Sequence, residues 1–334
     1  MKKKKINLVT SMTPHRISFA GGGSDIPHYF KKLGGKIINC TIDKFVYVTV
    51  KRHHQVFNEM FRIMYSKTEH KNDIKKIEND IVRESIKLTK VKGPILISTH
   101  SDVIVGSGLG SSSAFTVGLL NALYTFNGKK ISSFELAKKA CEIEIKILKK
   151  NGGIQDQFAS AVGGLNKFII QKNGMVKNKK LKLKKDKINK IFKNLLLIWS
   201  NQSRSSESIS KTYKKDFSSI KAIINNVDLF HKLITDRKLD LKKIGNFLNI
   251  SWLMKKKLSS KISNSNLDKT YNFMKKAGAL GGKISGAGGG GFFIFLMPQN
   301  KQKKIMNKKI LSSCMNVNYY PKGTKIISKI YDTI

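Results

Sequence analysis

The stretch VGSGLGSSSAF, residues 105–115, combines glycines and serines in a pattern suited to binding an anion. Glycine lets backbone N–H groups approach a ligand closely, and a helix that begins at the serines would point its positive end at the same place. The familiar phosphate loop GxxxxGKS/T is absent, because no lysine follows these glycines. The segment therefore predicts a loop that binds phosphate through backbone groups.

A carboxylate interrupts the apolar face of a helix predicted over residues 133–150. Ser132 and Glu135 supply a capping box for this helix. Its apolar face is formed by Phe134, Leu136, Ala137, Ala140, Cys141, Ile143, Ile147 and Leu148. Glu144 falls in the middle of that face, where an unpaired carboxylate would be costly. It is either held by an internal ion pair or hydrogen bond, or it is a ligand of Mg²⁺, which prefers carboxylates together with phosphate oxygens.

The segment NGGIQDQFASAVGG, residues 151–164, places Asp156 in the first turn of a short predicted helix, between Gln155 and Gln157. An acid in a first turn is common because it interacts favourably with the helix dipole, but the dipole does not explain the two amides. Three polar groups at the start of an apolar helix indicate the wall of a site. Asp156 could accept a proton from an attacking hydroxyl, or orient that hydroxyl.

Two further segments are rich in glycine. RISFAGGGSD, residues 16–25, places Arg16 at the start of a strand and Asp25 after three glycines. Either Ser24 or Asp25 caps the helix predicted over 27–33, or the triple glycine lies against a ligand, since a cap needs only one turn residue. KISGAGGGG, residues 283–291, satisfies the dinucleotide pattern GxGxxG only formally, because a strand follows it where a helix is needed.

Strand-like and helix-like segments occur in both halves of the chain, which predicts an α+β protein. Residues 72–90 read as an amphipathic helix, 165–183 as a hairpin, and long helices are expected up to about residue 281. The lysine-rich segment 177–190 is the candidate domain boundary. Predicted strands lie at 6–10, 16–20, 36–52, 61–66, 93–102, 194–201, 292–298 and 325–334.

The 334-residue chain is strongly basic, with 64 Lys and Arg against 21 Asp and Glu and a formal net charge of +43. The lysines are spread along most of the chain, as an AT-rich codon bias would produce, and no nucleic-acid-binding motif accompanies them. Cys40, Cys141 and Cys314 lie far apart and predict buried thiols in a reducing compartment. No apolar run approaches the ~18 residues of a membrane span, so the expectation is a cytoplasmic protein without a membrane partner.

Together these motifs resemble those of the GHMP kinases. RISFAGGGSD, GSGLGSSSA at 106–114 and KISGAGGGG occur in the order seen in that family, with Glu144 and Asp156 between them. The resemblance implies a two-domain fold. Residues 1–180 would form an ATP-binding domain like the second domain of ribosomal protein S5, and residues 181–334 a ferredoxin-like C-terminal domain.

The resemblance also implies roles for individual residues. Mg²⁺ would be held by Ser112 (or Ser111) and Glu144, Asp156 would be the base or the orienting group, and Arg16 would support the transferring phosphoryl group or the substrate. ATP would contact Gly106, Ser107, Gly108, Leu109, Gly110, Ser111, Ser112 and Ser113. The substrate would contact Arg16, Gly22, Gly23, Ser24, Asp25, Asp156, Arg204, Gly286, Gly288 and Gly289.

Within the family, the motifs are most similar to those of kinases acting on D-glycero-D-manno-heptose 7-phosphate. This implies transfer of phosphate from ATP to the C1 hydroxyl, giving a 1,7-bisphosphate for nucleotide-activated heptose and surface polysaccharide. Another sugar such as fucose, or a non-sugar alcohol, is an alternative substrate. A non-catalytic, basic nucleic-acid-binding protein is the remote alternative, and a homodimer is left open.

The sequence departs from this branch in three places. WSNQSRSSESIS, residues 199–210, keeps Arg204 but lacks the usual threonine-glycine pair before it. Ile104 and Val105 stand where a proline is common, and His15 stands where the residue before Arg16 is usually apolar. No departure removes a charged catalytic group. Arg204 remains a candidate clamp for a substrate phosphate, because guanidinium matches phosphate geometry.

Overall fold

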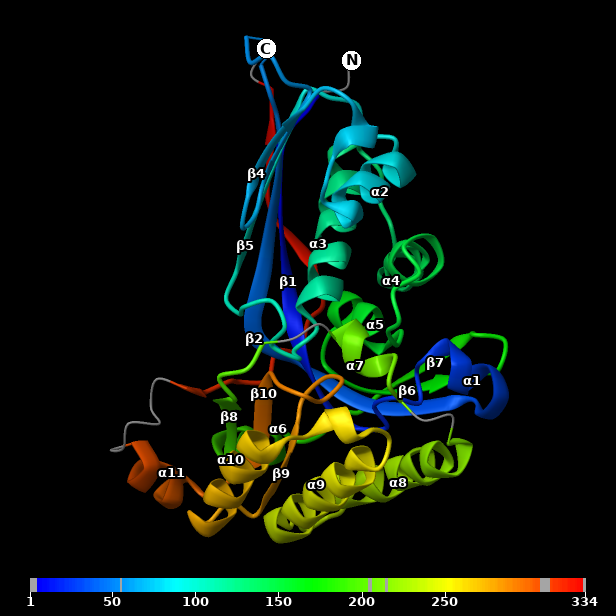
Figure 1. Ribbon diagram of the computed structural model, residues 1–334. Coiled ribbons are helices and arrows are strands. Elements are labelled where there is room, and N and C mark those ends of the chain that lie inside the picture. Colours follow the sequence, from blue (N-terminus) through cyan, green and yellow to red (C-terminus); the bar gives the residue numbers. More distant parts are fainter. Residues whose placement is uncertain (1–4, 55, 204–205, 214–215, 307–312, 333–334) are drawn as a thin grey trace.

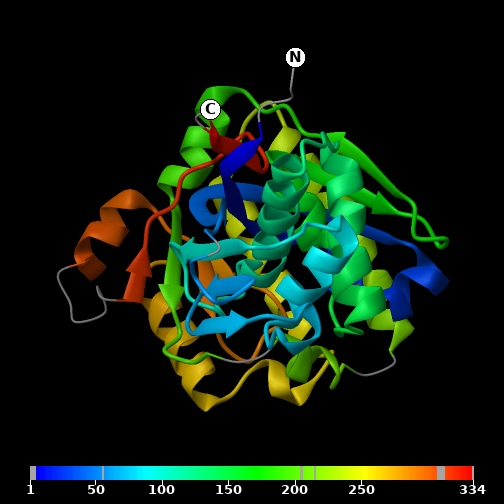
Figure 2. The same ribbon diagram turned by 90° about the horizontal axis from the view of Figure 1, so that it is seen from above.

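The computed structural model describes residues 5–54, 56–203, 206–213, 216–306 and 313–332. These residues form two lobes, the upper one built on a large sheet and the lower one on a small sheet (Figure 1). Figure 2 looks down on the molecule from the first-lobe end. Among the described residues, no helix combines the length and the apolar character needed to cross a bilayer.

The large sheet has eight strands in the part of the chain that the structure describes. Six follow the order β12-β1-β2-β5-β3-β4, while β6 pairs with the first part of β2 and β7 pairs with β6. All pairs are antiparallel except β3 with β5. The strands are β1 Ile6–Ala20, β2 Gly35–Arg52, β3 Phe61–Met64, β4 Thr68–Lys71, β5 Ile95–Ser101, β6 Leu165–Ile170, β7 Val176–Lys180 and β12 Lys325–Tyr331.

Helices cover one face of this sheet, to the right of it in Figure 1. Val46, Val48 and Val50 point into this interface at the period of two that a half-buried strand requires. The helical elements of the first lobe are α1 Pro27–Leu33, the 3₁₀ turn η1 Ile74–Lys76, α2 Asp80–Thr89, α3 Ser111–Phe126, α4 Ser133–Cys141, the π-helix η2 Glu142–Ile147 and α5 Gln155–Val162.

The central helix α3 is fixed closely against β1. Ser11 Oγ donates to the Gly118 carbonyl at 2.8 Å, and a Cβ on Gly118 would lie 2.6 Å from Thr13 Oγ1. Most of the α3 side chains are buried, as expected for a helix that is apolar on nearly all sides. The start of α3, where the glycine-serine loop lies, is therefore held in place by the core of the lobe.

The second lobe contains an antiparallel sheet of order β11-β8-β10-β9 among the described residues. Its longer helices gather at the lower end of the molecule (Figure 1). The strands are β8 Leu195–Trp199, β9 Gly281–Ile284, β10 Phe292–Leu296 and β11 Cys314–Met315. The helices are α6 Lys185–Lys193, α7 Ser206–Ser210, α8 Phe217–Thr235, α9 Leu241–Lys256, the 3₁₀ turn η3 Ser260–Ile262, α10 Ser265–Lys276 and α11 Gln299–Met306.

The last strand does not stay with the second lobe. β12 pairs with β1, with Ile6 opposite Tyr331, so the beginning of β1 and the end of β12 lie side by side (Figures 1 and 2). The final strand of the segment 181–334 thus belongs to the sheet formed by residues of the segment 1–180. The candidate boundary at 177–190 contains the end of β7 and the beginning of α6.

The two lobes share a hydrophobic core. Ile17 and Phe19 of β1 cluster with Leu197 of β8, Phe230 of α8 and Ile294 of β10. The rings of Phe19 and Phe230 stack with their centroids 5.4 Å apart. Because buried apolar contacts run without a break from one lobe to the other, the lobes are joined firmly at the place where the glycine-rich segments meet.

Several predicted elements differ from those observed. The strands predicted over 6–10 and 16–20 form one continuous strand, β1. The helix predicted over 72–90 begins only at Asp80, because Glu69 accepts hydrogen bonds from the backbone N–H groups of Glu78 and Asn79, and Asn79 then caps α2. The helix predicted over 133–150 is α-helical only to Cys141 and continues as the π-helix η2. The hairpin predicted over 165–183 is present as β6 and β7.

Candidate active site

The loop before α3 presents backbone N–H groups that the protein does not use. Gly106, Gly108 and Gly110 have φ angles of 80°, 77° and 80°, a region that favours glycine. Among the described residues, the N–H groups of Gly108, Gly110 and Ser111 donate no hydrogen bond within the protein. We call residues 106–113 the phosphate loop. Its free donors at a helix N-terminus form a suitable site for an anion.

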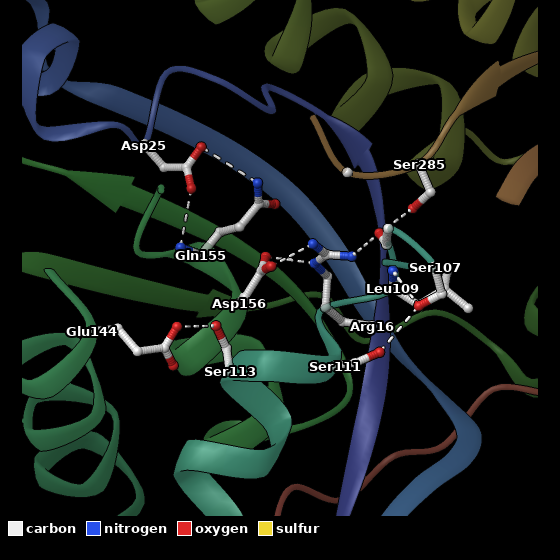
Figure 3. Close-up of polar contacts among 12 residues, drawn as sticks. Arg16, Asp25, Ser107, Leu109, Ser111, Ser113, Glu144, Gln155, Asp156 and Ser285 are labelled. Atoms are coloured by element: carbon white, nitrogen blue, oxygen red, sulfur yellow. Dashed lines mark hydrogen bonds and ion pairs between the residues drawn. The ribbon is translucent and has the colours of Figure 1, made fainter. Parts of the chain in front are cut away.

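The phosphate loop is held from two sides. The Gly108 carbonyl accepts hydrogen bonds from Arg16 Nη1 and from Ser285 Oγ, each at 2.8 Å (Figure 3). The Arg16 N–H also donates to the Leu109 carbonyl at 3.1 Å. A Cβ on Gly108 would lie 2.6 Å from the Ser285 carbonyl oxygen, so this glycine is required by the close approach of the two segments.

Arg16 and Asp156, which are far apart in the sequence, form a bidentate ion pair. Arg16 Nε donates to one carboxylate oxygen at 2.6 Å, and Nη2 donates to the other at 2.5 Å (Figure 3). The Arg16 side chain is 3% exposed and that of Asp156 is 21% exposed. The planar guanidinium therefore fixes the orientation of the Asp156 carboxylate, while one edge of that carboxylate faces the cleft.

Asp25 is buried beside this pair. Its carboxylate accepts hydrogen bonds from the backbone N–H groups of Gly23 and Gln155 at 3.1 Å and from Gln155 Nε2 at 3.4 Å. Burial, and to a smaller extent the negative charge of Asp156, raise the pKa of Asp25 to about 6. Gly153 must be glycine, because a Cβ there would lie 1.7 Å from an oxygen of Asp25.

The capping interpretation of Ser24 and Asp25 is wrong. The N-cap of α1 is Ile26, and no side chain caps this helix. Ser24 Oγ donates to the Gly21 carbonyl at 2.7 Å and to the Lys36 carbonyl at 3.1 Å, which fixes the triple-glycine turn. Asp25 instead accepts hydrogen bonds from Gln155 (Figure 3).

Glu144 is buried next to the first turn of α3. Ser113 Oγ donates to Glu144 Oε2 at 3.1 Å, whereas Glu144 Oε1 is buried and has no hydrogen-bond partner in the described structure (Figure 3). Burial raises the pKa of Glu144 to about 7. The π-helix η2 carries this residue, and such π-segments occur often at functional sites.

The Glu144 site fits a divalent cation. A buried carboxylate oxygen without a partner is a suitable ligand, and a bound cation would favour the ionised form that burial opposes. No group of three or more His, Cys, Asp or Glu that could hold a metal occurs among the residues described. A cation here would therefore need oxygens from a bound phosphate, as Mg²⁺ usually does. Ser113 contacts Glu144, while Ser112 is exposed on the same turn.

One cleft of about 590 Å³ between the lobes collects most of the predicted site residues. They are Arg16, Gly22, Gly23, Asp25, Gly106, Ser107, Gly108, Gly110, Ser111, Ser112, Ser113, Glu144, Asp156 and Gly286. Four of the predicted site residues do not line this cleft: Ser24, Leu109, Gly288 and Gly289. Gly288 and Gly289 pack against Ile262, and Leu109 is buried in the core. Arg204 lies outside the described residues.

Three residues that were not predicted from the sequence line the cleft or hold the phosphate loop. Ser285 holds the phosphate loop, and Lys255 and Lys283 line the cleft from the second lobe. Lys283 begins the KISGAGGGG motif, so a lysine at the start of a buried glycine-rich segment was the available signal. Lys255 lies among other lysines of α9, and nothing in the sequence distinguishes it from them.

A cleft with unused loop N–H groups at one end and an oriented carboxylate beside them is suited to phosphoryl transfer. The chain belongs to the GHMP kinase family and is an ATP-dependent kinase. The model of the GHMP kinases N terminal domain matches residues 73–164, and that of the GHMP kinases C terminal matches residues 215–308. The family and the two-domain fold predicted from the motifs are confirmed.

Similar proteins cover nearly the whole chain. D-glycero-alpha-D-manno-heptose 7-phosphate kinase of Campylobacter jejuni is 30% identical over 318 residues, which cover 89% of this chain and 92% of that protein. Mevalonate kinase of Thermococcus sibiricus is 27% identical over 240 residues, 67% of each chain. The crystal structure of a D-glycero-D-manno-heptose 1-phosphate kinase from Bacteriodes thetaiotaomicron matches with a TM-score of 0.78 and 24% identity, covering 97% of this chain and 100% of that one.

Proposed function

We propose that this kinase transfers the γ-phosphoryl group of ATP to the C1 hydroxyl of D-glycero-D-manno-heptose 7-phosphate, forming the 1,7-bisphosphate for nucleotide-activated heptose. The observation that carries the proposal is the arrangement of the phosphate loop, the Arg16–Asp156 pair and Asp25 in one cleft. The heptose 7-phosphate kinase of C. jejuni, which is similar over nearly its full length, supports this acceptor. Because ATP is a cytoplasmic metabolite, we place the reaction in the cytoplasm.

The phosphate loop would hold the nucleotide. The N–H groups of Gly108, Gly110 and Ser111 would donate to phosphate oxygens at the positive end of α3. We assign Ser112 and Glu144 as the residues that would hold Mg²⁺. When bound, Mg²⁺ neutralises charge on the phosphate oxygens during transfer.

The Arg16–Asp156 pair would act on the acceptor. Asp156 would accept a hydrogen bond from the C1 hydroxyl, orient it, and take its proton as the new bond forms. Arg16 would keep the carboxylate in place and add positive charge beside the transferring group, in a reaction that depends mainly on positioning and electrostatics. Asp25 would accept hydrogen bonds from other sugar hydroxyls, with the backbone of Gly22 and Gly23 against the ring. We retain Arg204 as a candidate contact of the sugar phosphate.

The test is an ADP-release assay with Mg²⁺–ATP across a panel of acceptors. The panel contains D-glycero-D-manno-heptose 7-phosphate, mannose 6-phosphate, fucose, galactose, mevalonate and homoserine, and phosphorus NMR locates the new phosphate. We expect turnover confined to the heptose phosphate, with the new phosphate on C1. Preferred turnover of fucose or mevalonate would refute the substrate and keep the family.

A second measurement addresses the alternative of nucleic-acid binding. Binding to arbitrary duplex DNA is measured at several salt concentrations, because charge-driven binding weakens steeply as salt rises. We expect only weak binding at physiological salt. Tight binding, together with no turnover on any member of the panel, would favour the non-catalytic interpretation.

A further inference from the structure

Two buried lysine side chains line the cleft on its second-lobe side. Lys255 lies on α9 and is 8% exposed, and Lys283 lies on β9 and is 6% exposed. Lys255 Nζ donates to the Gly286 carbonyl, and Lys283 Nζ donates to the Phe19 carbonyl at 3.0 Å. The transfer step described above uses neither ammonium group.

The positive charge of Lys283 is not balanced by any residue that the structure describes. Arg16, its cationic neighbour, is already paired with Asp156. In the part of the chain that the structure describes, no carboxylate lies within 4 Å of Lys283 Nζ. Burial, and to a smaller extent the positive charge of Arg16, lower the pKa of Lys283 to about 7. Because a buried ammonium without a counter-ion is unfavourable, an anionic ligand here would be stabilised.

Neutral hydrogen-bonding groups lie on the same wall. Ser251 and Lys255 are four residues apart on α9 and therefore share one face of the helix. Asn226 of α8 donates to Ser251 Oγ at 3.4 Å, and all three residues line the cleft. An amide, a hydroxyl and an ammonium supply the donors that a phosphate group requires.

The α8–α9 part of this wall adjoins the triple-glycine turn. A Cβ on Gly23 would lie 3.8 Å from Ile220 of α8 and 3.9 Å from Leu258, which follows α9. The free N–H groups for the nucleotide lie on the first lobe, at the start of α3. An acceptor placed between Asp156 and the triple-glycine turn would extend its far end toward α8 and α9.

We propose that Lys255 and Lys283, with Asn226 and Ser251, form an anion subsite that binds the phosphate group already present on the acceptor sugar. The inference rests on the proposed function, in particular on a phosphorylated acceptor. The subsite would select sugar phosphates over the corresponding free sugars, and it would leave the affinity for ATP unchanged.

The test compares steady-state kinetics of wild type, Lys255→Met and Lys256→Met on heptose 7-phosphate and on free heptose. Lys256 is the matched control, because it adjoins Lys255, loses the same charge and pairs with Asp268 at 3.2 Å on the surface. Lys255→Met is expected to raise the KM for heptose 7-phosphate about ten- to hundredfold, the usual effect of losing a charge-assisted hydrogen bond. The KM for ATP and the kcat/KM for free heptose should change less than about threefold, and Lys256→Met should match wild type.

Inorganic phosphate provides a second readout. It should compete with heptose 7-phosphate in wild type, and its inhibition constant should rise about tenfold in Lys255→Met. If Lys255→Met does not fold, Ser251→Ala replaces it, with an expected rise of about threefold in the KM for heptose 7-phosphate alone.

Two outcomes would overturn the subsite. One is an equal loss for the phosphorylated and the free sugar, which indicates that Lys255 only supports the Gly286 loop. The other is a raised KM for ATP, which would assign the lysines to the nucleotide. Wild type that does not phosphorylate heptose 7-phosphate would instead refute the proposed function, so the two failures are distinguishable.

Discussion

The phosphate loop lies against a second glycine-rich loop, residues 285–291. The two loops have similar compositions but different roles. Both contain glycines with positive φ, from Gly106 to Gly110 in one and from Gly286 to Gly291 in the other. A Cβ on Gly286 would lie 2.8 Å from Gly108 Cα. The phosphate loop continues into helix α3, and the second loop continues into strand β10.

The difference lies in where the backbone N–H groups are directed. In the second loop, Gly289 donates to the Ile262 carbonyl at 2.6 Å and Gly291 donates to the Gln202 carbonyl at 2.9 Å. In the phosphate loop, the N–H groups of Gly108, Gly110 and Ser111 have no partner among the residues described. In this protein, free donors at a helix N-terminus suit the phosphate loop for binding an anion, whereas the second loop is anchored through Gly289 and Gly291 to Ile262 and Gln202.

The largest effect expected on the phosphate-loop side is that of Glu144→Gln. The amide is neutral and cannot neutralise a divalent cation, so kcat should fall by about 10³-fold. The measurement is kcat with saturating Mg²⁺–ATP, alongside the melting temperature. Glu142→Gln is the control, because Glu142 lies on the same π-helix and pairs with Lys139 at the surface. Near-normal turnover in Glu144→Gln would refute the metal assignment.

Replacing the adjacent serines one at a time would sharpen that assignment. Ser112→Ala should raise the Mg²⁺ concentration for half-maximal activity about 10- to 100-fold, because a ligand is lost. Ser113→Ala should have a smaller effect, since Ser113 contacts Glu144 and orients it. A titration of activity with Mg²⁺ decides the matter. The reverse order of effects would transfer the role of ligand from Ser112 to Ser113.

Adding one methyl group to each loop tests the comparison directly. A Cβ on Gly110 would lie 3.3 Å from Arg16 Cγ and 3.4 Å from Asp156 Oδ2, so Gly110→Ala should lower kcat/KM about tenfold. A Cβ on Gly288 would lie 2.6 Å from Ile262 Cγ2, away from the cleft. Gly288→Ala should therefore lower the melting temperature by about 2–5 °C with little change in kcat/KM. Equal kinetic losses in both variants would remove the distinction between the loops.

The smallest effect concerns Lys283 and pH. Its pKa is about 7 in the folded protein against 10.5 ordinarily, so between these values the unfolded chain binds more protons than the native state. The stability of wild type should therefore rise with pH across this window relative to Lys283→Met. The measurement compares the melting temperatures of Lys283→Met and wild type in phosphate-free buffer. Between pH 7 and pH 9.5, the melting temperature of wild type should gain about 2–5 °C relative to that of the variant. Parallel curves would contradict a buried, neutralisable lysine.

The sequence was most informative where one residue conflicted with its surroundings. Glu144 on an apolar helix face and the amides beside Asp156 both indicated a site, and the structure places Glu144, Gln155 and Asp156 in the same cleft. The bounds of α1 followed from Pro27 at its start and the glycines after Leu33. These features depend on local chemistry, which short stretches of sequence contain.

Features that depend on distant parts of the chain could not be predicted. Nothing local pairs Arg16 with Asp156 across 140 positions, directs Asp25 to Gln155, or separates Lys255 from its lysine neighbours. The capping interpretation of Ser24 and Asp25 was wrong because Ser24 binds the carbonyls of Gly21 and Lys36, and Asp25 accepts hydrogen bonds from Gly23 and the distant Gln155. The family resemblance supplied the roles of such residues, but it did not supply Ser285 or Lys283.

Because β12 returns to the first lobe, the sheet of that lobe cannot be completed until the end of this sequence has been translated. β1 is synthesised long before β12, so the edge of β1 that β12 covers stays unpaired until residues 325–331 have been made, about 300 residues later at 5–20 residues per second. For some tens of seconds the nascent chain would carry an open sheet edge, which is prone to pairing with other chains.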